Sequence, residues 1–399
     1  MKKILFVCYG SSHVAMTVPV ARAVQEAGLA EVLVLGLTTA APVVLAAGLP
    51  LVQVKDFLRP GDAAALARGR ELLASLGPVD DEEESAAYLG LSYEELSLEQ
   101  GEQAAAERYA ENGRQAFLPR ALMSRILTAV RPDLLVATNS PRAERAAVLA
   151  AGTLGIPAVC MIDLFAIDEV RWIGQPGYAQ RLCVLNEHVK QFLVAAGRRA
   201  DEITVTGNPA LDALMNPALP AQGAALRKAS GWEGKCVLLW PVQDEPAIHP
   251  FNGKPGNPGL PARLLAVLCE WVLRHPDVVL CVRPRPGGPA PVLPDQPRFC
   301  ITGQDWPLSP LLHAVDAVVT LNSMVGLQGH LAGARLIQVL GSCFDEAMPL
   351  ARFGIADAEV TLEALPAALD HWSAAARRET PAAAAAATPR VLKVLSEFL

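Results

Sequence analysis

A histidine near the start of the sequence has the type and the setting of a catalytic group. His13 follows Gly10, Ser11 and Ser12, a turn with so little side-chain bulk that a substrate can approach the imidazole closely. Histidine has an ordinary pKa near neutrality, so in this setting it can act as a general base. The sequence therefore offers His13 as a candidate base, and a histidine that only caps its own helix is the alternative interpretation.

A polar turn at residues 322–328 separates a Val-rich apolar run from a segment of small residues with helical character. Asn322 and Ser323 are typical helix caps, because their side-chain oxygens accept hydrogen bonds from free backbone N–H groups. The first turn of a helix presents such donors together with a partial positive charge, which suits a phosphate group. A strand–helix–strand unit without a ligand is the alternative. The predicted phosphate turn consists of Asn322, Ser323, Val325 and Gly326.

Two further groups of polar residues follow apolar runs in the second half of the sequence. Arg283 and Arg285 follow the run 278–282, and the prolines next to them favour extended backbone. The planar guanidinium group matches the oxygens of a phosphate, so we predict that both arginines support phosphate binding. The other group of polar residues follows the run 237–240 and consists of Gln243, Asp244 and Glu245.

Two carboxylates in the first half of the sequence are alternative bases. Glu144 lies at a predicted helix start after the run 134–138, and Asp163 ends the next apolar run. Arg142 and Arg145 flank Glu144 in the sequence. This cluster of charges can bind a polar group, and mutual pairing at the surface is the alternative interpretation.

These positions come together if the apolar runs are buried strands of parallel sheets. In the first half such runs alternate with helical segments and lie at 4–8, 32–37, 51–54, 134–138, 156–163, 182–185 and 203–206. A second series lies at 237–240, 278–282, 317–321 and 336–340. This rhythm predicts an α/β fold with two Rossmann-like open parallel sheets. Such sheets bind ligands at the carboxyl ends of their strands, which is where the polar residues follow.

Shifts in composition divide the sequence into parts. The first domain is predicted to span 1–215 and to include a helical excursion at about 59–127, which flanks the substrate cleft and can carry acceptor specificity. The acidic run 80–84 in this excursion is predicted to be solvated surface without a ligand. The second domain is predicted to span 216–380, and residues 381–399 are predicted to form a helix that crosses back to the first domain.

Composition excludes several classes of protein. With 399 residues, 52% of them hydrophobic, the sequence is too long for one core. The net charge of −7 argues against a protein that binds nucleic acid by neutralising phosphates. The eight cysteines show no disulfide or metal-ligand spacing, which is typical of the reducing cytoplasm. The first apolar run is too short for a signal peptide, and prolines and glycines interrupt the uncharged stretch 32–54, so no membrane span is predicted.

Three short motifs resemble the GT-B glycosyltransferase superfamily. Residues 205–214, VTGNPALDAL, are similar to the GNPxxD segment of lipid-A-disaccharide-synthase-like transferases and of UDP-N-acetylglucosamine 2-epimerases. Residues 322–328 resemble the NSTVGLE turn of capsule- and polysaccharide-type members, and residues 10–13 resemble the GGGH turn of the sugar transferases. The resemblance covers nearly the whole chain and implies two Rossmann-like domains that face each other across a cleft.

The resemblance implies a cytoplasmic glycosyltransferase. A nucleotide-activated sugar would bind in the second domain and pass to a glycan, lipid or protein acceptor held by the first. In such enzymes helix N-termini and basic side chains neutralise the diphosphate leaving group, so the resemblance implies no metal and no cofactor. Asn208, in the GNP motif, and Gln328, in place of a glutamate that holds donor hydroxyls, join the predicted donor site. Sugar or acceptor hydroxyls would meet Gln243, Asp244 and Glu245 there. No nucleic acid is expected as a partner; contact with a membrane surface and the oligomeric state are left open.

The sequence departs from these relatives at three points. Gln328 is neutral where they carry glutamate, so its hydrogen bond to a hydroxyl is weaker. Arg285 stands in place of the histidine of their RPHP motif, and the SGGxQEE turn of the epimerases does not occur in the sequence. A UDP-sugar 2-epimerase, hydrolysing or not, and a non-catalytic nucleotide-sugar-binding protein are the alternative functions.

Overall fold

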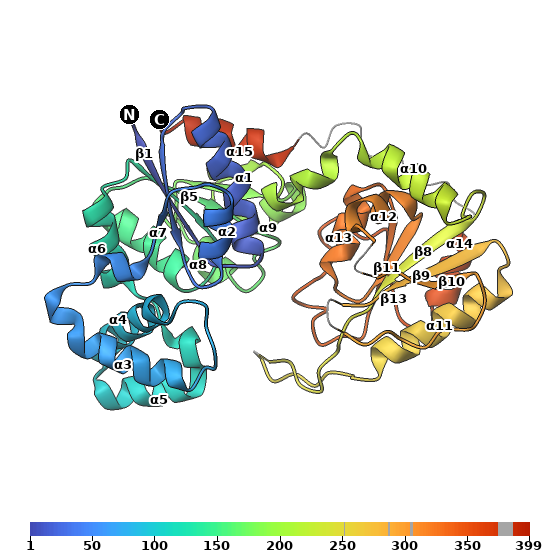
Figure 1. Ribbon diagram of the computed structural model, residues 1–399, viewed down its shortest axis with the longest axis horizontal. Coiled ribbons are helices and arrows are strands. Elements are labelled where there is room, and N and C mark those ends of the chain that lie inside the picture. Colours follow the sequence, from blue (N-terminus) through green and yellow to red (C-terminus); the bar gives the residue numbers. More distant parts are fainter. Residues whose placement is uncertain (251, 286–287, 304–305, 374–385) are drawn as a thin grey trace. The chain divides into compact units, whose positions relative to one another are not determined.

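The computed structural model describes residues 1–250, 252–285, 288–303, 306–373 and 386–399. It consists of two α/β units, shown in Figure 1. Unit 1 comprises Met1–Asp212 together with Ala386–Leu399, and unit 2 comprises Ala213–Ala385. Each unit contains one sheet whose strands pair in parallel, and helices connect successive strands. The predicted fold class, α/β with two Rossmann-like open parallel sheets, is confirmed.

The sheet of unit 1 has the strand order β3-β2-β1-β4-β5-β6-β7. Its strands are β1 Lys3–Cys8, β2 Glu31–Gly36, β3 Leu51–Val52, β4 Leu134–Thr138, β5 Ala158–Met161, β6 Arg181–Val184 and β7 Ile203–Val205. Every residue of β4 is buried, as expected for a central strand covered by helices on both faces. The order reverses between β1 and β4, and open parallel sheets bind ligands at such a reversal.

The helices of unit 1 fall into two groups. Those that connect or cover the sheet are α1 Ser12–Glu26, α2 Ala40–Ala46, α7 Ala143–Leu154, α8 Val170–Ile173, α9 Glu187–Ala195 and α15 Ala387–Ser396. The segment between β3 and β4 holds η1 Val54–Phe57, η2 Pro60–Asp62, α3 Ala63–Ala74, α4 Glu82–Gln100, α5 Glu102–Asn112, η3 Gly113–Ala116 and α6 Arg120–Val130. Figure 1 shows α3, α4 and α5 grouped together beside the sheet.

Two glycines let α3 and α4 pack in backbone contact. A Cβ atom on Gly69 would lie 1.9 Å from the carbonyl oxygen of Ala86, and one on Gly90 would lie 1.9 Å from that of Ala65. Real Cβ atoms do not approach so closely, so any larger residue would push the helices apart. The close crossing therefore depends on glycine at both positions.

The acidic run 80–84 is more than solvated surface. Glu84 is only 3% exposed, and its carboxylate accepts hydrogen bonds from Val54 N–H (3.1 Å) and Lys55 N–H (3.0 Å). Asp81 accepts from Glu84 N–H (3.0 Å) at the start of α4 and pairs with Lys55 Nζ (2.5 Å). The prediction was therefore wrong for these two side chains, because they join the starts of η1 and α4.

Residues 386–399 complete the core of unit 1. Figure 1 shows α15, in red, beside α1, in blue, and the two helices share one hydrophobic core. The buried side chains that α15 adds to this core are Val391, Val394 and Leu395. Of the tail predicted as a helix that crosses back, residues 381–385 lie outside the described part of the chain.

Asp212, in the GNPxxD segment, fixes the first turn of α15. Its carboxylate oxygens accept hydrogen bonds from Ala387 N–H (2.6 Å) and Thr388 N–H (2.8 Å). Gly207 has a φ of +84°, and a Cβ atom there would lie 3.2 Å from the Ala387 Cβ. This motif therefore serves as the docking point of α15, with the carboxylate acting as a helix cap.

The sheet of unit 2 has the order β10-β9-β8-β11-β12-β13. Its strands are β8 Cys236–Pro241, β9 Val278–Arg283, β10 Phe299–Ile301, β11 Ala317–Thr320, β12 Arg335–Val339 and β13 Ala358–Val360. The helices are α10 Leu219–Ala229, α11 Leu260–Arg274, α12 Leu308–Ala314, α13 Met324–Leu331 and α14 Leu365–Ser373, preceded by η5 Pro209–Met215 at the junction of the units. The order reverses between β8 and β11, which marks the expected ligand edge of this unit.

The uncharged stretch 32–54 contributes to the sheet of unit 1. It forms most of β2, then α2 and β3. Within the described residues, the search for a helix both long and apolar enough to cross a bilayer finds none.

Candidate functional site

The predicted base lies where the strand order of unit 1 reverses. His13 is in the first turn of α1, directly after β1, and its Nδ1 atom is 2.6 Å from Oγ1 of Thr138 at the end of β4. Thr138 Oγ1 donates a hydrogen bond of 2.8 Å to Glu144 Oε1, in the first turn of α7. Three side chains from three elements thus form one chain of contacts at the carboxyl edge of the sheet.

The direction of these bonds fixes the tautomer of neutral His13. The Thr138 hydroxyl has one proton, and it donates that proton in its hydrogen bond to Glu144 Oε1. Thr138 Oγ1 must then accept from His13, so this network assigns the proton to Nδ1 and the lone pair to Nε2. The imidazole bonds across to β4 and does not cap α1. Because the side chain is 21% exposed, its lone pair can serve as a base for a bound substrate.

Glu144 is completely buried, which is rare for a carboxylate and requires compensating partners. Besides the threonine hydroxyl, its Oε1 atom accepts from Tyr9 N–H (2.9 Å). Within the described residues no ion pair joins Glu144 to Arg142 or Arg145. Arg142 lies over the ring of Tyr9, and Arg145 lies over the ring of Trp172. The alternative of mutual surface pairing is therefore wrong. A buried carboxylate behind an imidazole orients the ring and stabilises its protonated form.

Asp163, the second alternative base, lies beside the same edge. Its backbone N–H donates to Asn139 Oδ1 (3.0 Å), and its carboxylate accepts from Ser12 Oγ (3.3 Å) in the first turn of α1. Asn208 donates through Nδ2 to the Asp163 carbonyl oxygen (2.6 Å), and its Oδ1 atom accepts from Ala210 N–H (2.9 Å). The amide of Asn208, predicted to bind the donor, is thus used to hold a turn within unit 1.

Gln243 organises the corresponding edge of unit 2. It follows β8, and its Oε1 atom accepts from Thr320 Oγ1 (2.8 Å), from Leu321 N–H (3.0 Å) and from Asn322 N–H (3.3 Å). Its Nε2 atom donates to Asn322 Oδ1. Gln243 therefore fixes the predicted phosphate turn after β11, with both ends of its amide group used by that turn.

The same network reaches the loop after β12. Asn322 Nδ2 donates to Ser342 Oγ (2.8 Å), and Ser342 donates to Glu245 Oε2 (2.7 Å). Glu245 Oε1 accepts from Cys343 N–H (2.7 Å). Burial alone would raise the pKa of the Glu245 carboxyl, but the hydrogen bonds from Cys343 and Ser342 outweigh burial and hold this pKa below its ordinary value. Asn322 and Glu245, both predicted to bind the donor, hold neighbouring loops together.

The helix start after this turn is capped from within. Ser323 is the N-cap of α13, and its Oγ accepts from Val325 N–H (3.2 Å). Gly326 N–H bonds to the Ser323 carbonyl oxygen, and a Cβ atom on Gly326 would lie 2.9 Å from Thr320 Cγ2, so this glycine lets α13 pack on the sheet. Met324 N–H makes no hydrogen bond to the residues that the structure describes, so it can donate to a ligand.

The two predicted phosphate-binding arginines differ in their surroundings. Arg285 forms an ion pair with Asp244, and both side chains are half exposed or more. Arg283 is partly buried, and its Nη1 atom donates to the carbonyl oxygen of Trp306 (3.0 Å). Burial lowers the pKa of the Arg283 guanidinium. Gln328 is half-buried in α13.

No metal centre is apparent in the described part of the chain, where no group of three or more His, Cys, Asp or Glu side chains is arranged to hold an ion.

Sequence reasoning missed two threonines that occupy matching positions. Thr138 ends β4, which pairs with β1, and Thr320 ends β11, which pairs with β8. The Thr138 hydroxyl joins His13 to Glu144. The Thr320 hydroxyl donates to Gln243. The available signal was a threonine at or near the end of an apolar run, two to six residues before a predicted site residue.

Comparisons with known proteins identify the fold. No protein-family model and no curated protein matches the sequence. The UDP-GlcNAc 2-epimerase of Methanocaldococcus jannaschii has a TM-score of 0.56 at 12% identity, with 99% of each chain covered. A structure of S. aureus MnaA with UDP has a TM-score of 0.57 at 11% identity, and the match covers all of this chain and 97% of the MnaA chain. The glycotransferase of kitacinnamycin has a TM-score of 0.55 at 15% identity, and the match covers all of this chain and 99% of the other. At such identities the likeness shows the fold alone, and it is the GT-B fold that the motifs predicted.

Proposed function

We propose that this chain, built on the GT-B fold, is a glycosyltransferase. It moves a sugar from a nucleotide-activated donor, bound by unit 2, to a hydroxyl of a glycan, lipid or protein acceptor held by unit 1, without a metal ion. The observation that carries the proposal is the contact chain from Glu144 through Thr138 to His13. This chain of contacts leaves the lone pair of His13 Nε2 available to accept a proton from a substrate. Such a base is needed because a hydroxyl that attacks a sugar must lose its proton.

In the proposed reaction the acceptor oxygen bonds to the anomeric carbon, and its proton passes to Nε2 of His13. The bond from that carbon to the diphosphate breaks, and the nucleoside diphosphate leaves with the bonding electrons. Glu144, buried behind the base, stabilises the imidazolium that forms. The charge on the leaving group is met by Met324 N–H at the start of α13 and by the guanidinium of Arg283, with Arg285 in support.

The nucleotide can be found by a thermal-shift screen of UDP-, GDP-, CMP-, CDP- and dTDP-sugars. UDP compounds come first, because three of the similar structures contain UDP or UDP-GlcNAc. A ligand present at 100 times its Kd stabilises the state that binds it by about 2.7 kcal/mol. The matching donor should therefore raise the melting temperature clearly, and the other sugars should leave it unchanged.

The reaction is tested by measuring nucleoside diphosphate release with and without an acceptor. Release that requires the acceptor supports the transferase. Release or sugar interconversion without an acceptor supports a UDP-sugar 2-epimerase, an alternative that the epimerases among the similar structures favour. Binding without turnover supports a non-catalytic nucleotide-sugar-binding protein, the alternative to which the neutral Gln328 points.

A further inference from the structure

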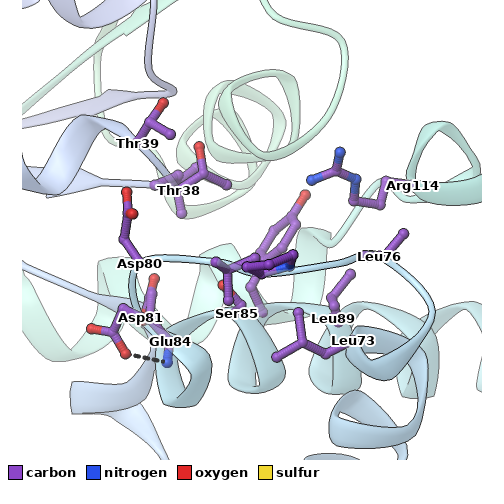
Figure 2. Close-up of a pocket in the computed structure, with 14 residues that line it drawn as sticks. Thr38, Thr39, Leu73, Leu76, Asp80, Asp81, Glu84, Ser85, Leu89 and Arg114 are labelled. Carbon is purple, nitrogen blue, oxygen red and sulfur yellow. Dashed lines mark hydrogen bonds between the residues drawn. The ribbon is translucent and has the colours of Figure 1, made fainter.

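Unit 1 contains a pocket of about 310 Å³ between the end of β2 and the helices α3 and α4 (Figure 2). Figure 2 shows leucine side chains at one end, and threonine and carboxylate side chains toward the other. The leucines are Leu73, Leu76 and Leu89. A cavity of this size, with an apolar wall and a few polar groups, is typical of a site for a small molecule.

Apolar side chains at this pocket are exposed to solvent. Leu76 is 42% exposed and Val79 is 38% exposed, although both are large hydrophobic residues in the loop between α3 and α4. Next to a cavity, such exposed apolar surface marks a place where a ligand removes it from water. The ligand should therefore have an apolar body.

The pocket wall is linked to the proposed base through a chain of contacts. Tyr88, in the pocket wall, has its hydroxyl oxygen 2.5 Å from that of Tyr9, and Tyr9 N–H donates to Glu144. Thr39 also lines the pocket, and a Cβ atom on Gly10 would lie 1.8 Å from Thr39 Oγ1. The pocket wall therefore packs against the turn that leads into His13.

The charges at the polar end are not equivalent. Asp81 is paired with Lys55, and the oxygens of Glu84 accept backbone N–H groups, so both carboxylates are compensated within the protein. Asp80, in contrast, makes no hydrogen bond or ion pair with the described residues. Figure 2 places Arg114 on the opposite side of the pocket from Asp80. A ligand that reaches the polar end therefore meets an uncompensated negative charge.

We propose that this pocket binds the acceptor, and that the acceptor has an apolar, ring-sized body and a cationic amine that faces Asp80. The assignment of the ligand as acceptor rests on the proposed function. The acceptor classes considered above are glycan, lipid and protein. A glycan lacks the apolar body that this pocket requires, so the pocket does not match a glycan. The threonine end of the pocket lies next to the turn before His13, where Thr39 meets Gly10.

The test uses three phenols of similar size and different charge. Binding of tyramine, 4-ethylphenol and 3-(4-hydroxyphenyl)propionate to the purified full chain is measured by calorimetry without any nucleotide sugar. Tyramine should bind with a Kd about fivefold lower than that of the acid, the size expected for one partly exposed charge contact. Asp80→Asn should bring this ratio close to one, whereas the matched control Glu83→Gln, an exposed carboxylate of the same run outside this pocket, should not.

A second variant tests the location. Ser85→Phe places a ring in the pocket from a half-buried position and should abolish binding of all three phenols, with its circular dichroism melt as a check of folding. Equal affinities for the three phenols, or binding that survives Ser85→Phe in a folded protein, overturns the proposal. If the phenols bind as expected but no donor is turned over in their presence, the pocket stands and the transferase proposal fails.

Discussion

At the scale of single residues, Thr138 is the link whose removal tests the base most cleanly. Thr138→Val keeps the shape of the side chain but removes the hydroxyl between His13 and Glu144. A hydrogen bond to a charged group contributes roughly 1.5–3 kcal/mol, so turnover should fall by about 10- to 150-fold. Affinity for UDP, measured by calorimetry, should not change, because the proposed donor site lies in unit 2.

Thr138→Ser is the matched control for that experiment. It restores a hydroxyl at the same position and should recover most of the turnover. A role in packing alone predicts the opposite order, since valine fills the space better than serine does. His13→Ala should lower turnover by about 10²- to 10⁴-fold. If the alanine variant keeps more than a tenth of wild-type turnover, the base is elsewhere, with Asp163 as the next candidate.

The two arginines should contribute unequally to donor binding. Arg285 is already paired with Asp244, whereas Arg283 is partly buried and bonds to a carbonyl oxygen. Arg283→Ala should therefore weaken UDP binding more than Arg285→Ala does, by up to the roughly 1.5–3 kcal/mol of one charge-assisted contact. Uridine, which has no phosphate, should bind both variants as it binds the wild type. A parallel loss for uridine would assign the arginine to the fold instead.

Single residues could be predicted from the sequence where their role depends on position along a strand. His13 and Glu144 closely follow buried runs, so they could be placed at the ligand edge before their contacts were known. The roles of Gln243 and Asn322 could not, because their mutual hydrogen bond joins residues 79 positions apart and depends on which strands are neighbours. The predicted roles of these residues in binding the donor stay predictions.

At the scale of elements, the crossing of α3 and α4 reverses the usual effect of a glycine substitution. Gly152, in α7, has open space around its missing Cβ, so Gly152→Ala should stabilise the protein by about 0.4–1 kcal/mol. Gly69→Ala should instead destabilise it by about 1–3 kcal/mol, because the new methyl group meets the Ala86 carbonyl oxygen. Melting curves of both variants, followed by circular dichroism, should move in opposite directions.

The loop after β12 should respond to pH through Glu245. Its folded-state pKa is lowered, so its contribution to stability is present above the ordinary value of about 4.3 and is lost as the pH falls through the folded pKa. Glu245→Gln should therefore lower the free energy of unfolding by about 1–3 kcal/mol at pH 7 and by much less at pH 3. Tryptophan fluorescence suits this measurement, because five of the six tryptophans lie in unit 2.

Glu270→Gln is the matched control, because Glu270 is an exposed carboxylate on α11 of the same unit. It should leave stability unchanged at either pH. If Glu245→Gln lowers the free energy of unfolding equally at pH 3 and pH 7, the charge of Glu245 does not contribute to stability and only the shape of its side chain matters.

Elements were predictable where one local pattern determines them. The buried strands could be recognised from their apolar runs and the intervening helices from their spacing. The acidic run 80–84 has the sequence of a solvated face, but Glu84 is buried because the start of η1 needs acceptors for its N–H groups. That requirement comes from a contact between segments about 30 residues apart, so a local sequence pattern cannot predict it.

At the scale of the whole molecule, Asp212 should control how firmly α15 is docked. Asp212→Ala removes the acceptor for two N–H groups of the first turn, and the loss of such a cap costs roughly 0.5–2 kcal/mol. Amide hydrogen exchange in α15 should become faster. Asp212→Asn keeps one acceptor oxygen and should show a smaller effect. Unchanged exchange in the alanine variant would mean that apolar packing alone holds the helix.

The two-sheet architecture followed from the rhythm of the sequence because α/β alternation repeats twice along the chain. A helical pattern at the end of the sequence could suggest that a last helix returns to unit 1, but it could not show that this helix packs against α1. The shared core of these helices joins residues from opposite ends of the chain, and only the folded arrangement shows which surface of unit 1 is left for α15 to cover.

This arrangement determines when unit 1 can finish folding during synthesis. The ribosome makes unit 2 between the two parts of unit 1, and chains grow at roughly 5–20 residues per second, so α15 follows the rest of unit 1 after roughly ten to thirty seconds. During that interval the apolar surface of α1 that α15 covers is exposed to water and to chaperones. Each new molecule therefore passes through a period in which unit 2 can be complete while the older unit still lacks its last helix.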